Sequence, residues 1–154
     1  MTDFTMNKLA NVHNRYQGDY KRVLFLCSAG LLRSATAASV FSSPPFNWNT
    51  RNAGVTKEYA LIDVSLPLLE WAQEIYLMEP AHLKAVIEYC NEAGLDEHEV
   101  KRYVTKCRVL DVQDNYRYRD PALVKELKAA MKLVSVIPLK KTVKHVEKRK
   151  SKNG

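Results

Sequence analysis

The chain has 154 residues, of which 46% are hydrophobic and 27% charged, and it carries a formal net charge of +7. This length and composition predict one folded domain with a substantial core, and they exclude a disordered chain or two ordinary domains. No apolar stretch approaches the roughly 18 residues of a membrane span, and three scattered cysteines indicate neither a disulfide framework nor a zinc site. We therefore expect a cytoplasmic protein with no membrane contact, no metal and no cofactor.

Residues 1–20 stand apart from the pattern that follows them. Leu9, Val12 and Tyr16 fall at helical spacing, so this extension is expected to be a helix packed on the domain rather than a binding arm. The segment also lacks the apolar core of a signal peptide.

Strand-like and helix-like apolar patterns alternate four times across residues 21–133. The continuous apolar run Val23–Cys27 is typical of a strand buried on both faces of a parallel sheet. Further strands are expected at about Trp48–Ala53, Glu74–Met78 and Tyr103–Leu110. Helices are expected at Leu32–Phe41, about Ala60–Trp71, Pro80 to near Gly94, and Pro121 to about Leu133, with a solvated turn at Asp96–Glu99. The order predicts an α/β domain built on a four-stranded, doubly wound parallel sheet.

Residues 134–154 form a basic tail that is expected to be solvated and partly disordered. Between Lys132 and Gly154 there are eight Lys and Arg and one acid, Glu147, so this end holds the whole net charge. A polycation binds phosphates without sequence specificity, so the tail is expected to make at most weak contact with nucleic acid or another anionic partner.

The junction of the first strand and first helix reads Cys-Ser-Ala-Gly-Leu-Leu-Arg-Ser, residues 27–34. In a loop that leads into a helix N-terminus, unpaired backbone N–H groups point inward. Together with the helix dipole, they can bind a tetrahedral oxyanion. The same field, with Arg33, favours the nucleophilic thiolate of Cys27. Arg33 offers a planar fork for two phosphate oxygens, Gly30 permits a tight turn, and Ser34 can hydrogen-bond the departing thiolate. The predicted phosphate-binding loop comprises Ser28, Ala29, Gly30, Leu31, Leu32, Arg33 and Ser34.

A cysteine that ends a strand is often only a core residue, and Cys-x5-Arg recurs by chance. Here the cysteine ends a parallel strand, the loop contains a glycine, and Arg-Ser and a helix follow. This combination occurs by chance much less often, and it favours a nucleophilic role for Cys27.

Residues Lys21–Phe41 resemble, without a gap, the opening strand, loop and helix of the low-molecular-weight protein tyrosine phosphatases. The order of motifs agrees, since that family places the loop first and its general acid near the end. Ala53-Gly54 and Trp71–His82 are similar to the corresponding parts of a predicted bacterial and phage branch. The resemblance implies a metal-independent phosphatase that forms a phosphocysteine, most directly on phosphotyrosine, with a phosphorylated protein or small phosphomonoester as substrate.

The stretch Val112–Leu123 resembles the acid loop of that family, which implies Asp114 as general acid and Tyr116 as an aromatic pocket wall. Two other aspartates stay candidates for the acid. Asp120 precedes a proline, as the family's acid usually does, but aspartate and proline are also the N-cap and first turn of a helix. Asp111 directly follows the fourth strand and is expected to bond nearby backbone amides.

Several positions depart from the family's pattern. Leu32 stands where a second, protective cysteine is common, and Asn115 replaces the usual proline. Arg117 replaces a second pocket tyrosine, which favours a more anionic substrate. Cys90 and Cys107 fall on apolar faces and are expected to be core residues. The four histidines show no ligand spacing and are expected to lie at the surface or in helix packing: His13, His82, His98 and His145.

Two other functions stay open. Arsenate reduction uses the same scaffold but needs a relay of further reactive cysteines. A non-catalytic module would instead use the loop and tail to hold a phosphorylated partner.

Overall fold

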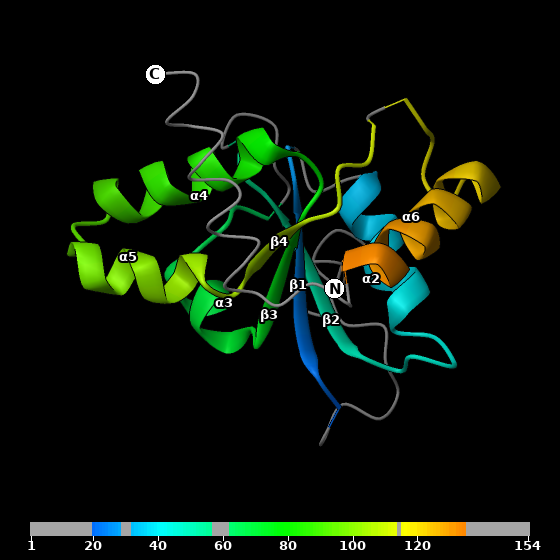
Figure 1. The fold of residues 1–154 in the computed structure, drawn as a ribbon, viewed down its shortest axis with the longest axis horizontal. Helices are drawn as coiled ribbons and strands as arrows, with labels where there is room; N and C mark the ends of the chain where they lie inside the picture. Colours follow the sequence, from blue (N-terminus) through cyan, green and yellow to red (C-terminus); the bar gives the residue numbers. More distant parts are fainter. Residues whose placement is uncertain (1–19, 29–31, 57–61, 114, 135–154) are drawn as a thin grey trace, which may run out of the picture.

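The sheet at the centre of the fold has four parallel strands in the spatial order β2-β1-β3-β4 (Figure 1). The computed structural model describes residues 20–28, 32–56, 62–113 and 115–134. The strands are β1 (Arg22–Cys27), β2 (Asn49–Gly54), β3 (Glu74–Leu77) and β4 (Cys107–Val109). This confirms the predicted four-stranded parallel sheet.

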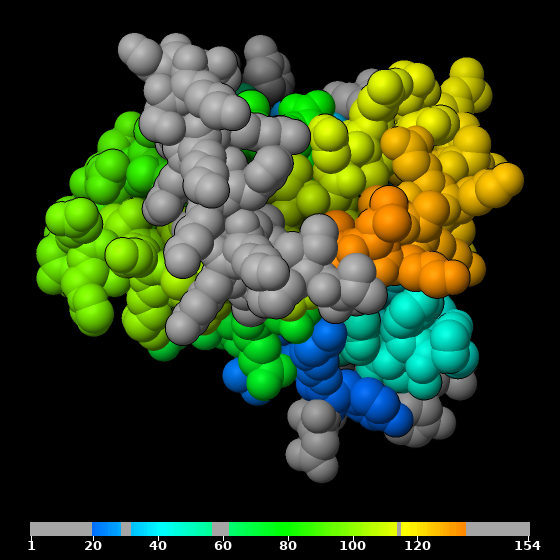
Figure 2. Space-filling view, viewed as in Figure 1, coloured from blue at the N-terminus to red at the C-terminus, as the bar shows by residue number. Residues whose placement is uncertain are grey.

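Helices cover both faces of the sheet, which is why β1 can be apolar from Val23 to Cys27. Val23, Phe25 and Cys27 point to one face and pack with α2 (Arg33–Phe41) and α6 (Pro121–Val134). Leu24 and Leu26 point to the other face, under α3 (Leu66–Trp71), α4 (Pro80–Glu92) and α5 (Glu97–Val104). Figure 1 shows these two layers on opposite sides of the strands, and in Figure 2 the orange atoms of α6 lie at the surface of the flank on which α6 packs against α2. The predicted doubly wound arrangement is confirmed.

The helix expected at about Ala60–Trp71 is shorter than predicted, because α3 begins only at Leu66. Before it, the Gly54 N–H donates to the Ile62 carbonyl at 2.9 Å, and the Val64 N–H donates to the Gly54 carbonyl at 3.0 Å. The chain therefore pairs with the end of β2 at this point, and a backbone engaged in that pairing cannot also form helical hydrogen bonds.

The predicted solvated turn at Asp96–Glu99 is wrong, and so is a strand starting near Tyr103. Asp96 is the N-cap of α5, and its Oδ1 accepts the Glu99 N–H at 2.8 Å. Three residues at helical spacing bury the inner face of α5: Val100, Tyr103 and Val104. The strand β4 therefore begins only at Cys107, and the acidic cluster is the start of a helix.

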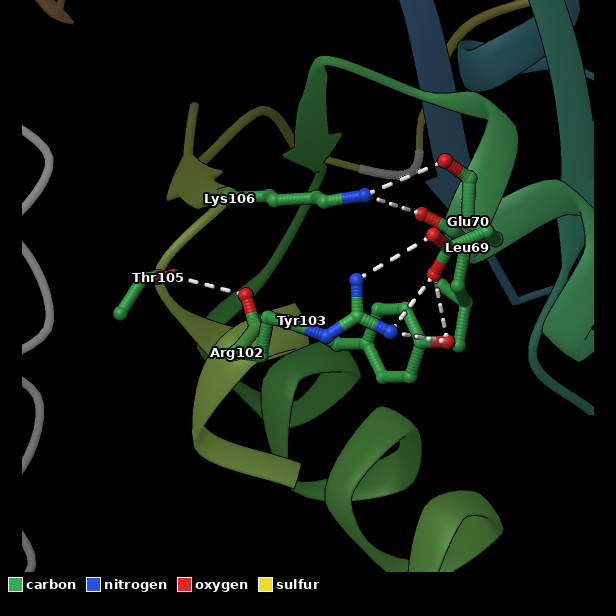
Figure 3. Close-up of polar contacts among 6 residues, drawn as sticks. All are labelled: Leu69, Glu70, Arg102, Tyr103, Thr105 and Lys106. Atoms are coloured by element: carbon green, nitrogen blue, oxygen red, sulfur yellow. Dashed lines mark hydrogen bonds and ion pairs between the residues drawn. The ribbon is translucent and has the colours of Figure 1, made fainter. Parts of the chain in front are cut away.

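A polar cluster joins the end of α3 to the end of α5 (Figure 3). The Glu70 carboxylate accepts two hydrogen bonds from Arg102, at 3.2 and 2.8 Å, and one from the Tyr103 hydroxyl at 2.8 Å. Lys106 Nζ donates to the Leu69 carbonyl at 2.8 Å and to the Glu70 carbonyl at 3.3 Å. The bonds from Arg102 and Tyr103 lower the pKa of Glu70 from 4.5 to about 2.

The predictions for residues 1–19 and 135–154 lie outside the described residues, as do those for His13 and His145. Within the described ranges, no helix has both the length and the apolar character needed to cross a bilayer.

Candidate functional site

Cys27 and Ser34, the two ends of the predicted motif, lie in contact. Cys27 ends β1 and is 3% exposed, while Ser34 lies buried in the first turn of α2. The distance between Cys27 Sγ and Ser34 Oγ is 3.0 Å. A hydroxyl at this distance can donate to a thiolate, which is the arrangement that the sequence predicts.

Backbone hydrogen bonds hold the start of the loop against the segment after β2. The Cys27 carbonyl accepts the Val55 N–H at 3.0 Å, and the Ser28 carbonyl accepts the Thr56 N–H at 2.9 Å. Three residues of the predicted loop, Ala29, Gly30 and Leu31, lie outside the described residues. Leu32 precedes α2 and is 40% exposed, and its side chain does not cap the helix.

Arg33 is almost wholly buried, at 2% exposure, in the first turn of α2. Its Nη1 donates to Glu79 Oε1 at 2.8 Å and to the Val112 carbonyl at 2.9 Å. An isolated buried charge is costly, so the carboxylate both compensates the guanidinium and orients it. Because β1, β3 and β4 are parallel, the chain segments after them meet at one edge of the sheet, which brings these residues together.

Sequence reasoning missed the role of Glu79 and His82 in this site. His82 is 3% exposed, and its Nδ1 accepts the Glu79 N–H at 3.2 Å. An accepting Nδ1 places the ring proton on Nε2, which lies 3.1 Å from Ser28 Oγ and 3.5 Å from Glu79 Oε2. His82 was expected at the surface or in helix packing, and it instead hydrogen-bonds the residue next to Cys27. Their place in the sequence could have indicated this role, because Glu79 and His82 follow β3, the strand that pairs with β1.

The three candidate acids have different surroundings. Asp120 Oδ1 accepts the Ala122 N–H at 2.8 Å, so this carboxylate caps α6. Asp111 is exposed with φ of +59°, and among the described residues no backbone amide bonds its side chain. Asp114 lies outside the described residues.

Tyr116 is half-buried and packs against the core between the sheet and α6. The neighbouring Glu126 carboxylate raises the pKa of Tyr116. The following turn is tied to α2, because the Arg119 N–H donates to Thr36 Oγ1 at 2.9 Å. Arg117, which replaces a tyrosine of the family's pattern, is exposed in this turn.

The remaining cysteines are core residues, as predicted. Cys90 on α4 and Cys107 on β4 are buried in the cluster under α4 and α5. Burial raises the pKa of both thiols, that of Cys107 to about 12. In the part of the chain that the structure describes, no group of three or more His, Cys, Asp or Glu could hold a metal ion.

Solved structures share this fold at low sequence identity. Wzb from Vibrio vulnificus, in complex with benzylphosphonate, aligns with a TM-score of 0.54 at 17% identity, over 77% of this chain and 99% of that chain. The tyrosine phosphatase AmsI of Erwinia amylovora aligns with a TM-score of 0.53 at 15% identity, over 78% and 95% of the two chains. For a low-molecular-weight protein tyrosine phosphatase from T. tengcongensis the TM-score is 0.52 at 19% identity, over 75% and 95%. No protein-family model and no curated protein matches the sequence. The chain has the fold of these phosphatases, as its sequence resemblance implies.

Proposed function

We propose that this chain, with the fold of the low-molecular-weight protein tyrosine phosphatases, is a cysteine-dependent phosphomonoester phosphatase. The observation that carries the proposal is the 3.0 Å contact of Cys27 Sγ with Ser34 Oγ, at the junction of a buried strand and a helix N-terminus. Arg33 follows in the same turn, held by Glu79. A nucleophile, an anion-binding helix end and an oriented guanidinium are the parts that phosphoryl transfer to a thiolate requires.

In the first step, the Cys27 thiolate attacks phosphorus in line with the leaving oxygen. The S–P bond forms as the P–O bond to the leaving group breaks, and the loop amides with Arg33 bind the equatorial oxygens. Asp114, in its protonated form, gives its proton to the leaving oxygen. Because α2 and Arg33 supply positive charge at the phosphate, this step needs no metal ion.

In the second step, water attacks the phosphocysteine and the S–P bond breaks. The Asp114 carboxylate takes the proton from the water, and inorganic phosphate leaves. The Ser34 hydroxyl donates a hydrogen bond to the thiolate that reappears on Cys27.

The choice of Asp114 as general acid rests on chain reach and on the engagement of Asp120. The Val112 carbonyl lies 2.9 Å from the Arg33 guanidinium. Asp114 follows two residues later, and two residues span at most about 7 Å, so its carboxyl can reach a phosphate bound at Arg33. The Asp120 carboxylate is already committed to the first turn of α6.

The proposed substrate is a phosphotyrosyl protein or a small aryl phosphomonoester. Tyr116 would form an aromatic wall of the pocket, and the exposed Arg117 beside it favours further negative charge on the substrate. The substrate-binding set is the loop from Ser28 to Ser34 together with Tyr116.

The decisive test is hydrolysis of p-nitrophenyl phosphate in the presence of a chelator. Cys27→Ser should lower kcat by at least about a thousandfold, because a serine hydroxyl is not ionised near neutral pH and is a much poorer nucleophile than a thiolate. Cys90→Ser is the matched control, since it changes a buried thiol on α4 and should leave turnover within about twofold. Activity that survives in Cys27→Ser would refute the proposal.

The same assay separates the alternatives. A non-catalytic phosphate-binding module would bind phosphate at this loop and release no nitrophenol. Arsenate reduction needs further reactive thiols, and the buried Cys90 and Cys107, with raised pKa values, are poorly suited to that relay.

A further inference from the structure

The N-terminal end of α4 carries two side chains that contact both sides of the predicted phosphate-binding loop. Glu79, the N-cap of α4, accepts a hydrogen bond from Arg33 near the end of the loop, with 2.8 Å between Oε1 and Nη1. His82, in the first turn of α4, has its Nε2 3.1 Å from Ser28 Oγ at the start of the loop. One helix end therefore holds the residues on either side of the loop.

Glu79 and His82 also hold each other. The Glu79 N–H donates to His82 Nδ1 at 3.2 Å, and the Glu79 side chain accepts the backbone N–H of His82, so the two residues form a capping box. The His82 ring is 3% exposed, and close packing restricts its orientation. Because Nδ1 accepts, Nε2 carries the ring proton and donates a hydrogen bond to the Ser28 hydroxyl.

The contact with Ser28 also constrains Cys27, because the two residues share a peptide bond. On the other side of the loop, Arg33 is followed directly by Ser34, whose Oγ lies 3.0 Å from Cys27 Sγ. The thiol and the guanidinium thus belong to two short segments that meet each other and are both hydrogen-bonded to α4.

From these contacts we infer that His82 is a positioning residue for the Cys27 nucleophile. The inference rests on the proposed function, in which Cys27 attacks phosphorus and Arg33 binds the phosphate oxygens. The hydrogen bond from His82 fixes Ser28, and with it the backbone that carries the thiol. Glu79 fixes the guanidinium from the same helix end, so nucleophile and phosphate ligand keep the relative placement that in-line attack requires. Loss of the His82 contact displaces the thiol, and proton delivery to the leaving oxygen is not affected.

The test combines three variants with two substrates. Ser28→Ala removes the hydroxyl, Ser28→Thr keeps one, and His82→Leu removes the ring. Phenolate is a more basic leaving group than p-nitrophenolate, so phenyl phosphate depends more on the general acid than p-nitrophenyl phosphate does. Tyr89→Phe is the matched control, because Tyr89 lies about two turns further along α4 and its hydroxyl accepts the Leu66 N–H at 3.0 Å.

In Ser28→Ala, we expect kcat/KM to fall about three- to tenfold, by the same factor for both substrates, as the loss of one hydrogen bond allows. Ser28→Thr should restore most of the loss, and Tyr89→Phe should change neither value. Because His82 acts through Ser28, the double variant with His82→Leu and Ser28→Ala should lose no more activity than His82→Leu alone.

The rate of Cys27 alkylation is a readout that needs no turnover. Iodoacetate carries a carboxylate that Arg33 attracts, and iodoacetamide is neutral, so the ratio of their rates reports how the thiol lies beside the guanidinium. Ser28→Ala should lower this ratio about three- to tenfold, and Tyr89→Phe should leave it unchanged.

Losses that differ between the two substrates, additive losses in the double variant, or an alkylation ratio that Ser28→Ala does not change would each overturn the inference while the phosphatase assignment stands. If the unaltered chain hydrolysed neither substrate, the proposed function itself would fail, and the inference with it.

Discussion

Arg33 shows how a single buried charge is compensated and oriented by its neighbours. The side chain is 2% exposed, and Glu79 supplies the opposite charge at 2.8 Å while the Val112 carbonyl accepts a second hydrogen bond. Burial without such partners would cost several kcal/mol. The guanidinium is therefore held in one orientation, and under the proposed function no reorganisation would be needed when charge develops on the phosphate oxygens.

The three aspartates near the site can be compared with one kind of substitution. Asparagine is a good N-cap and tolerates positive φ, so it preserves the local backbone at Asp120 and at Asp111. Asp114→Asn should lower kcat/KM for phenyl phosphate by about a hundredfold or more, and less for p-nitrophenyl phosphate, because only the acid is lost. Asp111→Asn and Asp120→Asn should leave the ratio of the kcat/KM values for the two substrates unchanged. If Asp120→Asn alone changes the ratio of the two substrates, Asp120 is the acid.

At the scale of elements, α3 is held in place by polar contacts as well as by its apolar face. It has only six residues, too few to be stable as an isolated helix. Ser65 Oγ accepts the Leu68 N–H at 3.4 Å at the start of the helix, and Lys106 donates to the carbonyls at its end. Glu70 then joins α3 to α5 through Arg102 and Tyr103.

The Glu70 cluster predicts a pH-dependent contribution to stability. The folded pKa is depressed from 4.5 to about 2, so the contribution is present above about pH 4.5 and disappears as the pH falls towards 2. Glu70→Gln should lower the urea midpoint at pH 7, and mutant and parent should converge towards pH 2. Because Glu70 and Arg102 are half exposed, salt should reduce the difference.

Glu88→Gln is the control for this measurement. Glu88 lies 4.0 Å from Lys84 on the exposed face of α4, and an ion pair of this kind contributes little. A midpoint difference for Glu70→Gln that stays constant from pH 7 to pH 2 would contradict the electrostatic account.

At the scale of the whole molecule, nearly all of the net charge lies outside the folded domain, because Lys132 in α6 is the one basic residue of this end that belongs to a described helix. All of the +7 charge lies between Lys132 and Gly154, and the rest of the chain is neutral in sum. The candidate site draws on segments that lie between Arg22 and Val134. Catalysis and any polyanion contact should therefore respond to different deletions.

Deletion of residues 140–154 should leave kcat/KM for p-nitrophenyl phosphate within about twofold, because the candidate site keeps all its described contacts. Any binding to single-stranded nucleic acid should weaken, and the dependence of log K on log salt should flatten. A full chain that binds no nucleic acid at low salt would show that the tail has no such partner.

Part of the fold and part of the site could be predicted because their signals are local. Cys27, Arg33 and Ser34 belong to one eight-residue stretch, and the apolar run of β1 identifies a strand buried on two faces. The sequence pattern does not predict the start of α5, because an acidic cluster at the start of a helix and a solvated acidic turn have similar compositions. Only burial of Val100, Tyr103 and Val104 against the core separates the two.

By itself, the sequence determined the α/β order, the strand–loop–helix junction and the candidate nucleophile with its arginine, because local periodicity and helix-end chemistry act over a few residues. Tertiary structure alone decided which distant groups complete the site. Glu79 meets Arg33 across 46 residues, His82 meets Ser28 across 54, and Arg119 meets Thr36 across 83. These contacts exist because parallel strands end at one edge of the sheet, and no local pattern encodes which strands become neighbours.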